Sequence, residues 1–430
     1  MVEVFKNAWT IKELRSKILF TLFIIVVFRF GSNLLVPFLD PSKIQELIQE
    51  GTLMQLMDTL TGGALGGGAI FAMSITPFIN ASIIMQLLTV AIPALERLSK
   101  EGDEGRKKIN RITKLGTIGI AIFQATAFYI SLRNVGAVHY TEGFDGILTM
   151  VSIIGCLVAG AMLVVWLGDQ ISEKGIGNGI SIVLFAGIVS SMPRDINGLI
   201  RQVDAQNQQN YFLVPLILVI YVLMIALVVL MQNSERRIPV QYAKRVVGRK
   251  MYGGQSSHIP IKVAMAGVMP IIFAMSIMSL PQTILSFFQI DGQNDSFWDG
   301  FVRVFSQNSW VYGVLYFFLI IGFNFFYIAM QYNPIEIANN LKKNNGAIPG
   351  IRPGKPTSDF IQNSLSKITL IGAIFLGFIA VFPIIFTNVT AIQGLSLGGT
   401  TLLIVVGVIL ETVRQLESQM MMRHHKGFLE

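Results

Sequence analysis

Ten apolar stretches divide this chain, and none of them carries an Asp or Glu near its middle. A run of about 20 apolar residues is long enough to cross a hydrocarbon core of about 30 Å. Apolar residues make up 52% of the chain and charged residues only 13%. The pattern predicts an all-α membrane protein with ten transmembrane helices. We expect them at residues 18–35, 62–92 (broken), 115–132, 147–167, 176–192, 212–231, 263–288, 311–330, 368–386 and 395–410.

Basic residues are concentrated in alternate loops. Of the 33 Lys and Arg residues, 27 lie in segments 1–17, 93–114, 168–175, 232–262, 331–367 and 411–430. Basic loops remain in the cytoplasm, so we expect these loops and both termini on the cytoplasmic side. The net charge of +8 then lies mostly on one face. No A-x-A-like cleavage site follows the first apolar stretch, which favours a retained span over a signal peptide.

The ten spans divide into five and five around a polar stretch at residues 194–210. Because each half has an odd number of spans, the second half starts from the opposite side of the membrane. Any structural repeat must therefore be inverted. We expect an N-terminal half at 1–205 and a C-terminal half at 206–430, with large cytoplasmic loops at 232–262 and 331–367. The two halves would form a clamshell around a central pore.

The second predicted span begins with five glycines between residues 62 and 68. Glycine in a helix interior costs about 1 kcal/mol relative to alanine, and Pro77 interrupts the hydrogen-bond ladder. Irregular backbone at membrane depth occurs only where it is buried in protein or lines a wet cavity, so we expect this segment inside the bundle. Two interpretations remain open: close helix packing through small residues, or a short movable element that fills a pore.

Six motifs occur in order along the chain. They are GGALGGG at 62–68, NASIIMQLL at 80–88, EGDEGRKK at 101–108, GIGNGIS at 175–181, RRIPVQYAKR at 236–245, and the loop 333–354 that ends in IPGIRPG. Together they resemble the bacterial SecY family, the pore subunits of the general protein-secretion translocase. The resemblance covers essentially the whole chain. It implies a channel in the bacterial cytoplasmic membrane that passes unfolded polypeptide across and releases apolar segments sideways into lipid.

The resemblance also implies a waist closed by an apolar ring and a plug. The residues that match the ring are Ile79, Ile83, Ile180, Leu184, Ile272 and Ile404. Those that match the plug are Gly62, Gly63, Ala64, Leu65, Gly66, Gly67, Gly68, Ala69, Ile70, Phe71, Ala72 and Met73. An apolar ring gates by dewetting and offers only weak contacts to a varied cargo. Taken alone, each isoleucine is more often lipid-facing or packed between helices.

In the family, the exit toward lipid opens between spans two and seven. Both spans carry polar side chains that are unusual for helices in lipid. The resemblance assigns the lateral gate to Asn80, Ile84, Gln86, Ser279, Leu280 and Gln282.

The basic loops predict partners. Such a surface binds RNA phosphates or acidic protein surfaces, or it simply enforces topology beside lipid headgroups. The resemblance implies contacts with the ribosome and the motor ATPase SecA through Arg237, Lys244, Arg245, Arg249 and Arg352. It further implies companion subunits SecE and SecG, and signal-sequence-bearing polypeptides as cargo.

Three other function classes fit the sequence less well. An enzyme is disfavoured because no phosphate-binding loop is present, and we expect no catalytic residue, metal or cofactor. A secondary transporter with inverted repeats usually needs a charged residue within the membrane. The clear charged residue within a predicted span is Arg29, and we expect its side chain to extend toward the membrane interface. The absence of a carboxylate within the spans therefore weighs against a transporter. A scaffold that only recruits ribosomes would leave the glycine-rich break unexplained.

Overall fold

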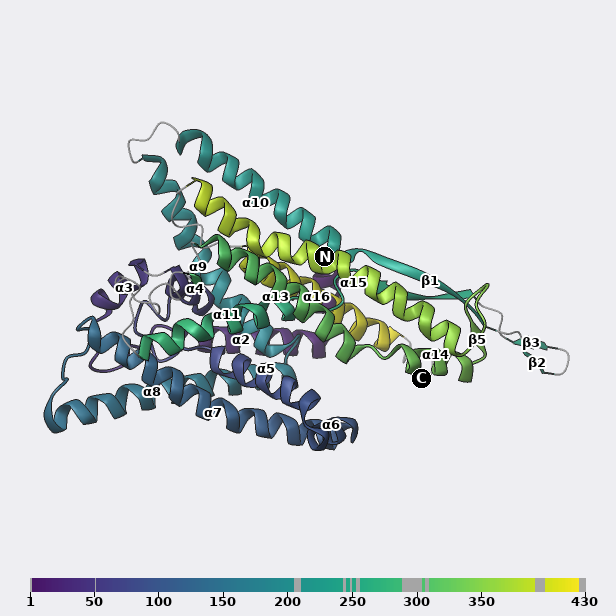
Figure 1. Cartoon of the computed structure of the whole chain (residues 1–430), viewed down its shortest axis with the longest axis horizontal. Coiled ribbons are helices and arrows are strands. Elements are labelled where there is room, and N and C mark those ends of the chain that lie inside the picture. The colour runs from purple at the N-terminus through teal and green to yellow at the C-terminus, as the bar shows by residue number, and fades with distance from the viewer. Residues whose placement is uncertain are drawn as a thin grey trace.

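A computed structural model describes residues 2–50, 52–204, 210–242, 245–247, 250–252, 256–287, 304–305, 309–390 and 399–424. It is an elongated helical bundle (Figure 1). The end that carries the strands, with α6 and α14, is called the hairpin end. The other carries α3 and α4 and is called the opposite end. The helices are α1 Val2–Thr10, α2 Lys12–Gly31, α3 Pro41–Glu50, α4 Thr52–Thr61, α5 Thr76–Ala91, α6 Pro93–Lys100, α7 Asp103–Asn134, α8 Gly143–Lys174, α9 Gly179–Asp204, α10 Asn210–Asn233, α11 Met269–Phe287, α13 Trp310–Gln331, α14 Pro334–Lys343, α15 Lys355–Thr390 and α16 Gly399–His424.

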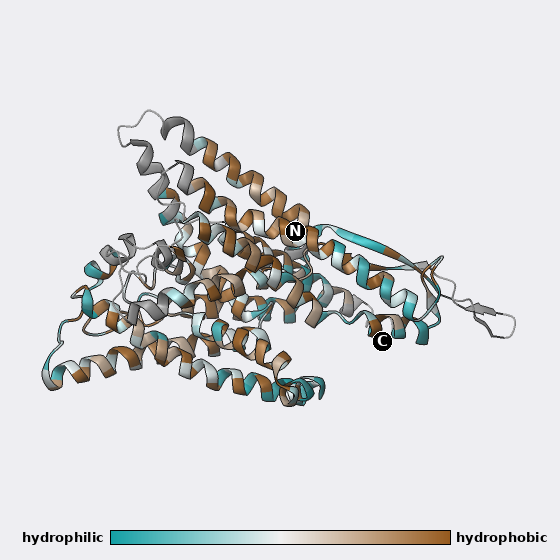
Figure 2. Cartoon of the chain, in the orientation of Figure 1, coloured by the Kyte–Doolittle hydropathy of each residue, from teal (hydrophilic) through white to brown (hydrophobic). Residues whose placement is uncertain are grey.

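Each predicted span coincides with a helix over most of its length. Among the described residues, six helices are long and apolar enough to cross a membrane, or seven if α5 and α6 form one span that bends by 102°. The apolar parts of α9 and α11 are shorter. The apolar residues form a band between more hydrophilic ends (Figure 2). The second span is broken as its sequence predicts, because helix α5 begins only at Thr76.

The expectation of a purely α-helical chain is wrong at the loop 232–262. This loop contains strands β1 Glu235–Tyr242, β2 Arg245–Val247, β3 Lys250–Tyr252 and β4 Ser256–Lys262, and β1 pairs antiparallel with β4 from Glu235↔Lys262 to Gln241↔Ser256. The short strand β5, Gly346–Ala347, pairs with the far end of β1. This loop forms strands because buried and exposed side chains alternate along β1, which is the two-residue period of a strand. Ile238 and Val240 are buried, while Arg237 and Pro239 are exposed.

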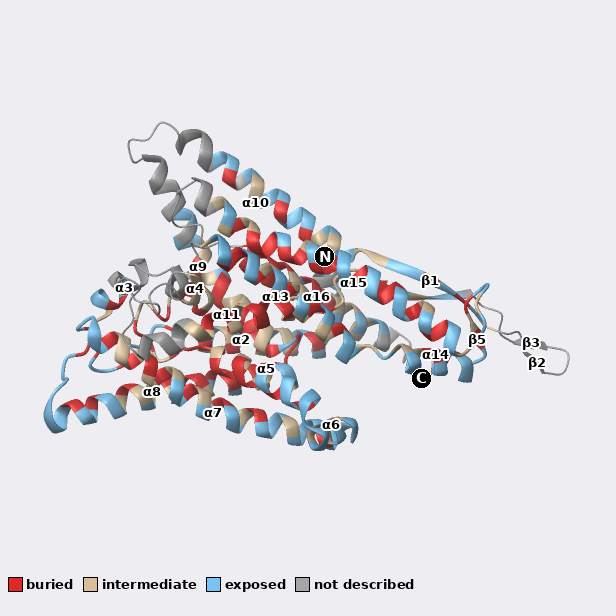
Figure 3. Ribbon diagram, viewed as in Figure 1, coloured by how far each residue is buried: buried red, intermediate tan, exposed pale blue. Residues whose placement is uncertain are grey.

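Buried residues are concentrated where the helices face one another (Figure 3), and the apolar ones among them form several clusters. One cluster draws its buried members only from residues 36–161, and a second draws them only from residues 224–410. A third combines residues from α2, α8 and α9 with Ile272 of α11 and Ile404 of α16. A fourth holds the β1–β4 hairpin against α14 and α15. The third cluster is therefore the place where elements distant in the sequence meet.

Candidate functional site

The glycine-rich segment between α4 and α5 is irregular and lies inside the bundle, as its sequence predicts. Residues 62–75 form successive turns, and no residue from 61 to 80 is exposed. The chain just after α2 supplies partners for its backbone, since the Ile70 amide donates to the Leu34 carbonyl at 2.8 Å and the Val36 amide donates to the Gly68 carbonyl at 2.9 Å. The segment thus satisfies its backbone without forming a helix, as an irregular stretch in a membrane protein must.

Neighbouring helices approach this segment through glycines of their own. A Cβ at Gly160 of α8 would collide with the carbonyl oxygen of Ile70, and one at Gly187 of α9 would collide with the carbonyl oxygen of Leu60. A Cβ at Gly31 of α2 would strike the ring of Phe71, which stacks on Phe28 with ring centroids 5.9 Å apart. The three helices can pack this closely around the segment only because glycine has no side chain at these contacts. We call this arrangement the glycine cradle.

Arg29 does not extend toward the interface, which corrects the sequence expectation. Its Nη1 donates to the carbonyl oxygen of Gly62 at 2.7 Å. Gly62 and Gly63 have φ values of +72° and +86°, a backbone conformation that L side chains rarely adopt. The guanidinium therefore holds the first turn of the irregular segment instead of reaching a headgroup.

Asp58 of α4 makes the second polar anchor, and the sequence analysis missed it. Its Oδ1 accepts a hydrogen bond from the Gly66 amide at 2.7 Å, and its Oδ2 pairs with Nη2 of Arg194 at 2.9 Å. The Asp58 side chain is 5% exposed and the Arg194 side chain 52%. Because Asp58 lies outside every predicted span, a search for charges near span centres passes over it. An acidic residue just ahead of a glycine run is the signal that was available.

A small cavity of about 30 Å³ lies between α4, α5, α9, α11 and α16. It is lined by Met57, Leu60, Thr76, Ile79, Leu184, Ile272, Met275, Ser276, Ser279 and Ile404. Four of the six residues assigned to the apolar ring therefore share one cavity. A volume of this size has room for about one or two water molecules. The polar groups on its wall are hydroxyls of Thr76, Ser276 and Ser279, and the remaining lining side chains are apolar.

The other two ring residues are placed differently. Ile180 is partly buried and packs in the same apolar cluster as Leu184, Ile272 and Ile404. Ile83 is buried on α5, but it neither lines the cavity nor belongs to that cluster. The structure thus brings five of the six predicted residues together.

Helices α5 and α11 are in contact, as the predicted lateral gate requires. Residues from both helices line the cavity. Asn80 and Ser279 are buried, Gln86 and Leu280 are half-buried, and Ile84 is 44% exposed. The side chain of Gln282 lies outside the described residues. The two amide atoms of Asn80 are buried and have no hydrogen-bond partner in the described structure.

Basic side chains line the root of the β1–β4 hairpin. Arg237 pairs with Glu235 at 2.7 Å, and the hydrogen bond from Arg237 lowers the pKa of the Glu235 carboxyl. Burial lowers the pKa of Lys262, and the charge of Arg414 acts in the same direction. Arg414 also donates to the Gln232 carbonyl at 2.8 Å, which ties α16 to the end of α10.

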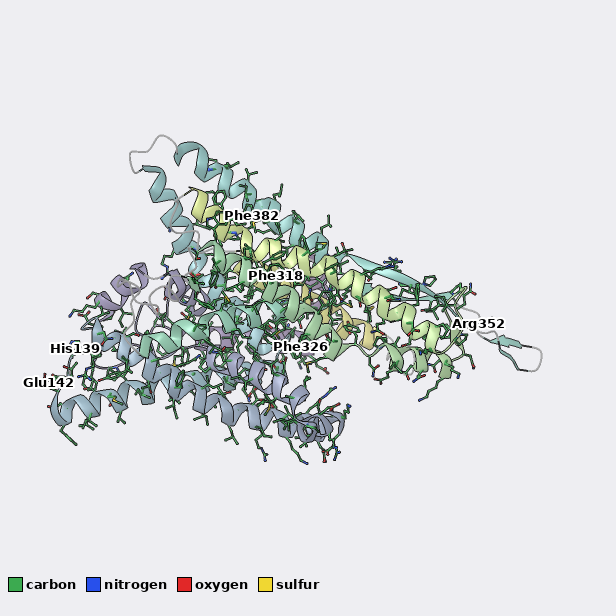
Figure 4. All side chains as sticks on the ribbon, in the orientation of Figure 1. His139, Glu142, Phe318, Phe326, Arg352 and Phe382 are labelled. Atoms are coloured by element: carbon green, nitrogen blue, oxygen red, sulfur yellow. The ribbon has the colours of Figure 1, made fainter. Side chains whose placement is uncertain are left out.

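The remaining predicted contact residues are less well defined. Lys244 and Arg249 lie outside the described residues, and Arg245 is described only as a backbone position of β2. Arg352 is exposed in the turn before α15, where its carbonyl oxygen accepts a hydrogen bond from the Thr357 hydroxyl at 2.8 Å. Figure 4 shows Arg352 at the hairpin end, whereas His139 and Glu142 lie at the opposite end.

Comparisons with known proteins identify the family. The sequence model of the SecY family matches residues 69–413. The protein translocase subunit SecY of Streptomyces galbus is 40% identical over 444 residues, which covers 100% of both chains. This chain belongs to the SecY family. As a SecY family member it is a membrane protein, which agrees with its apolar helices.

Two solved structures share the fold of this SecY family member. One comes from work on how the plug domain of the SecY protein stabilises the closed state of the translocation channel and maintains a membrane seal. It matches with a TM-score of 0.64 at 19% identity, over 94% of this chain and 92% of that chain. The other is Sec61 in the canine ribosome-channel complex, with a TM-score of 0.60 at 18% identity over the same shares of the two chains.

The glycine cradle generates a prediction on helix α8. Gly160→Ala should displace the segment at Ile70 and raise the resting ion conductance of the purified protein in planar bilayers, because the new Cβ has no space. Gly155→Ala is the matched control on the same helix, since a Cβ there meets nothing within 4 Å. Equal conductance of the two variants would show that close packing at Gly160 does not hold the segment in place.

Proposed function

We propose that this protein is a protein-conducting channel, in which ten membrane spans form two inverted five-helix halves at residues 1–205 and 206–430. Secretory polypeptides would cross between the halves in an unfolded state, and apolar segments would leave sideways into lipid. The single observation that carries the proposal is the buried, irregular segment that joins α4 to α5, two helices whose residues line an apolar cavity. Residues 62–73 would then be the plug, called the plug segment below.

The cavity lining supports a gated waist. Leu184 comes from the N-terminal half, while Ile272 and Ile404 come from the C-terminal half. A narrow apolar constriction excludes water and ions until a polypeptide enters, because wetting it is unfavourable. Ile79 and Ile180 would complete the ring. We retain Ile83 as a sixth member that would reach the pore only when α5 moves.

Polar substitutions at this waist test its role. Leu184→Asn, Ile272→Asn and Ile404→Asn together should raise the resting ion conductance of the reconstituted channel and relax its selectivity for signal sequences, because the waist loses its dewetting barrier. The matched control is Ile272→Leu with Ile404→Leu, which keeps the apolar character. A bilayer conductance no higher than that of this control would remove these residues from the gate.

The seam between α5 and α11 fits a gate that opens. Asn80 is 4% exposed, and its amide has no partner in the described structure. A buried polar group without a partner destabilises the state that contains it by about 1–3 kcal/mol. With Asn80 assigned to the seam by the resemblance, this penalty would lower the free energy needed to open it, so a signal sequence that offers its own apolar surface could shift the balance.

A crosslink across the seam tests this gate. The chain has a single cysteine, so Cys156→Ser supplies a thiol-free background. Ile84→Cys and Leu280→Cys, joined by a short bifunctional reagent, should block precursor transport, and cleavage of the crosslink should restore it. Each single cysteine variant, treated in the same way, should transport normally. Efficient crosslinking with undiminished transport would mean that this seam does not have to open.

The hairpin end would face the cytoplasm, together with both termini, in a bacterial cytoplasmic membrane. Its exposed Arg237 and Arg352 would contact the ribosome and the motor ATPase SecA, with Lys244, Arg245 and Arg249 near the hairpin tip. The fold shared with a chain from a ribosome-channel complex supports the ribosome as a partner. We further propose SecE and SecG as companion subunits, with surrounding lipid covering the remaining apolar faces. The energy for transport would come from these partners, and the channel itself would catalyse no reaction.

Arg352 provides the test of the motor contact. Arg352→Glu should abolish SecA-driven precursor transport into vesicles while leaving channel assembly intact, because it reverses one exposed charge without burying it. Arg133→Glu makes the same charge reversal at an exposed site near the opposite end of the molecule and should have little effect. Normal transport by the Arg352 variant would contradict the assignment.

A further inference from the structure

Three charged side chains from three different helices meet at the start of the plug segment. Arg29 of α2 donates a hydrogen bond to the Gly62 carbonyl oxygen at 2.7 Å, and Asp58 of α4 accepts a hydrogen bond from the Gly66 amide at 2.7 Å. Arg194 of α9 closes the cluster through its 2.9 Å contact with Asp58. Asp58 thus joins the plug backbone to α9, and Arg29 joins it to α2.

The backbone at this point has little freedom to rearrange around the charges. A Cβ at Gly62 would lie 2.8 Å from Nη1 of Arg29 and 2.9 Å from the Gly187 carbonyl oxygen, and one at Gly63 would lie 3.1 Å from Nη1 of Arg194. The Gly63 amide also donates to the carbonyl oxygen of Asp58 at 2.8 Å. The first turn of the plug segment is therefore enclosed by Arg29, Arg194 and the backbone of α9.

The charges depend on each other. A carboxylate that is almost fully buried is tolerated only when charged or polar partners satisfy it, and Asp58 has both Arg194 and the Gly66 amide. Arg29 and Arg194 lie beside two adjacent residues of the segment, Gly62 and Gly63, so their positive charges face each other over a short distance. Asp58 holds both the Gly66 amide and Arg194, so loss of its charge would weaken these two contacts at once.

We propose that Asp58 and Arg194, with Arg29, form a latch that sets how readily the plug segment is displaced, so that the latch contributes to the channel's discrimination between strong and weak signal sequences. This inference rests on the proposed plug function. Asp58 and Arg194 are positioning residues in this proposal, because they act on the cargo path only through the plug segment.

The latch also determines which half of the molecule keeps the plug. Arg29, Asp58, Arg194 and the partners Leu34 and Val36 all belong to residues 1–205. The facing wall of the cavity, with Ile272 and Ile404, belongs to the other half. When the halves separate, the plug segment remains with the N-terminal half until the latch breaks. Opening of the seam and displacement of the plug are then two separate steps.

A double-mutant cycle tests the latch in the intact, reconstituted channel complex. Asp58→Asn and Arg194→Gln should each raise resting ion conductance in planar bilayers by about tenfold, as expected when one charge-assisted contact is lost. The double variant should conduct no more than the stronger single variant, because both changes remove the same contact. Arg194→Lys, which keeps the charge, should stay near wild type, as should the exposed control Arg133→Gln.

A second measurement addresses selectivity. Transport of a precursor with a weakened signal sequence should rise several-fold in the Asp58 and Arg194 variants, whereas transport of the normal precursor should not change. Arg194 is half-exposed, so Arg194→Gln is expected to fold even if Asp58→Asn does not. Wild-type conductance and unchanged selectivity in Arg194→Gln would overturn the latch, and so would fully additive effects in the cycle. A wild-type complex that seals the bilayer but moves no precursor would contradict the proposed function, while the conductance cycle would still decide the latch.

Discussion

The structure depends on one constraint: an irregular backbone stretch inside a membrane protein must find internal partners for its polar groups. Each unsatisfied amide or carbonyl in hydrocarbon costs several kcal/mol. Residues 62–75 meet this requirement through Leu34, Val36, Asp58 and Arg29 and through their own turns. This stretch therefore requires specific surroundings. They are the loop after α2, the end of α4 and helix α9.

Glycine serves two different purposes at the site. Within the segment, Gly62 and Gly63 adopt positive φ values that make the first turn possible. In the neighbouring helices, Gly160 leaves room for the carbonyl oxygen of Ile70 in the segment, and Gly187 leaves room for that of Leu60 in the last turn of α4. Close packing and an irregular path therefore depend on each other, because only a helix without a Cβ at the contact can approach exposed backbone so closely.

The two ends of the molecule differ in their polar interactions. At the hairpin end the charges are largely exposed, and their pairs, such as Arg237 with Glu235, lie at the surface where an ion pair stabilises a fold only weakly. Near the opposite end the carboxylate of Asp58 is buried and holds a defined backbone geometry. The exposed charges at the hairpin end suit transient contacts with partners. The buried Asp58 carboxylate suits a segment that is either held in place or released.

The sequence by itself determined the properties that depend on local pattern. Runs of apolar residues predicted the helices, the glycines with Pro77 predicted the break in the second span, and ordered motifs predicted the family. Five of the six residues assigned to the apolar ring lie together in the structure. The hairpin was missed, although its alternating pattern was present, because a run of basic residues dominated the interpretation of that loop.

Only the tertiary structure decided which distant residues meet. Asp58 and Arg194 are 136 positions apart, and no periodicity connects them. The same is true of Leu184, Ile272 and Ile404, which share a cavity although they lie on α9, α11 and α16. The physical reason is that hydropathy and propensity act over a few residues along the chain. A polar contact across the bundle depends instead on how the helices cross, and the glycines at their contacts determine how closely they do so.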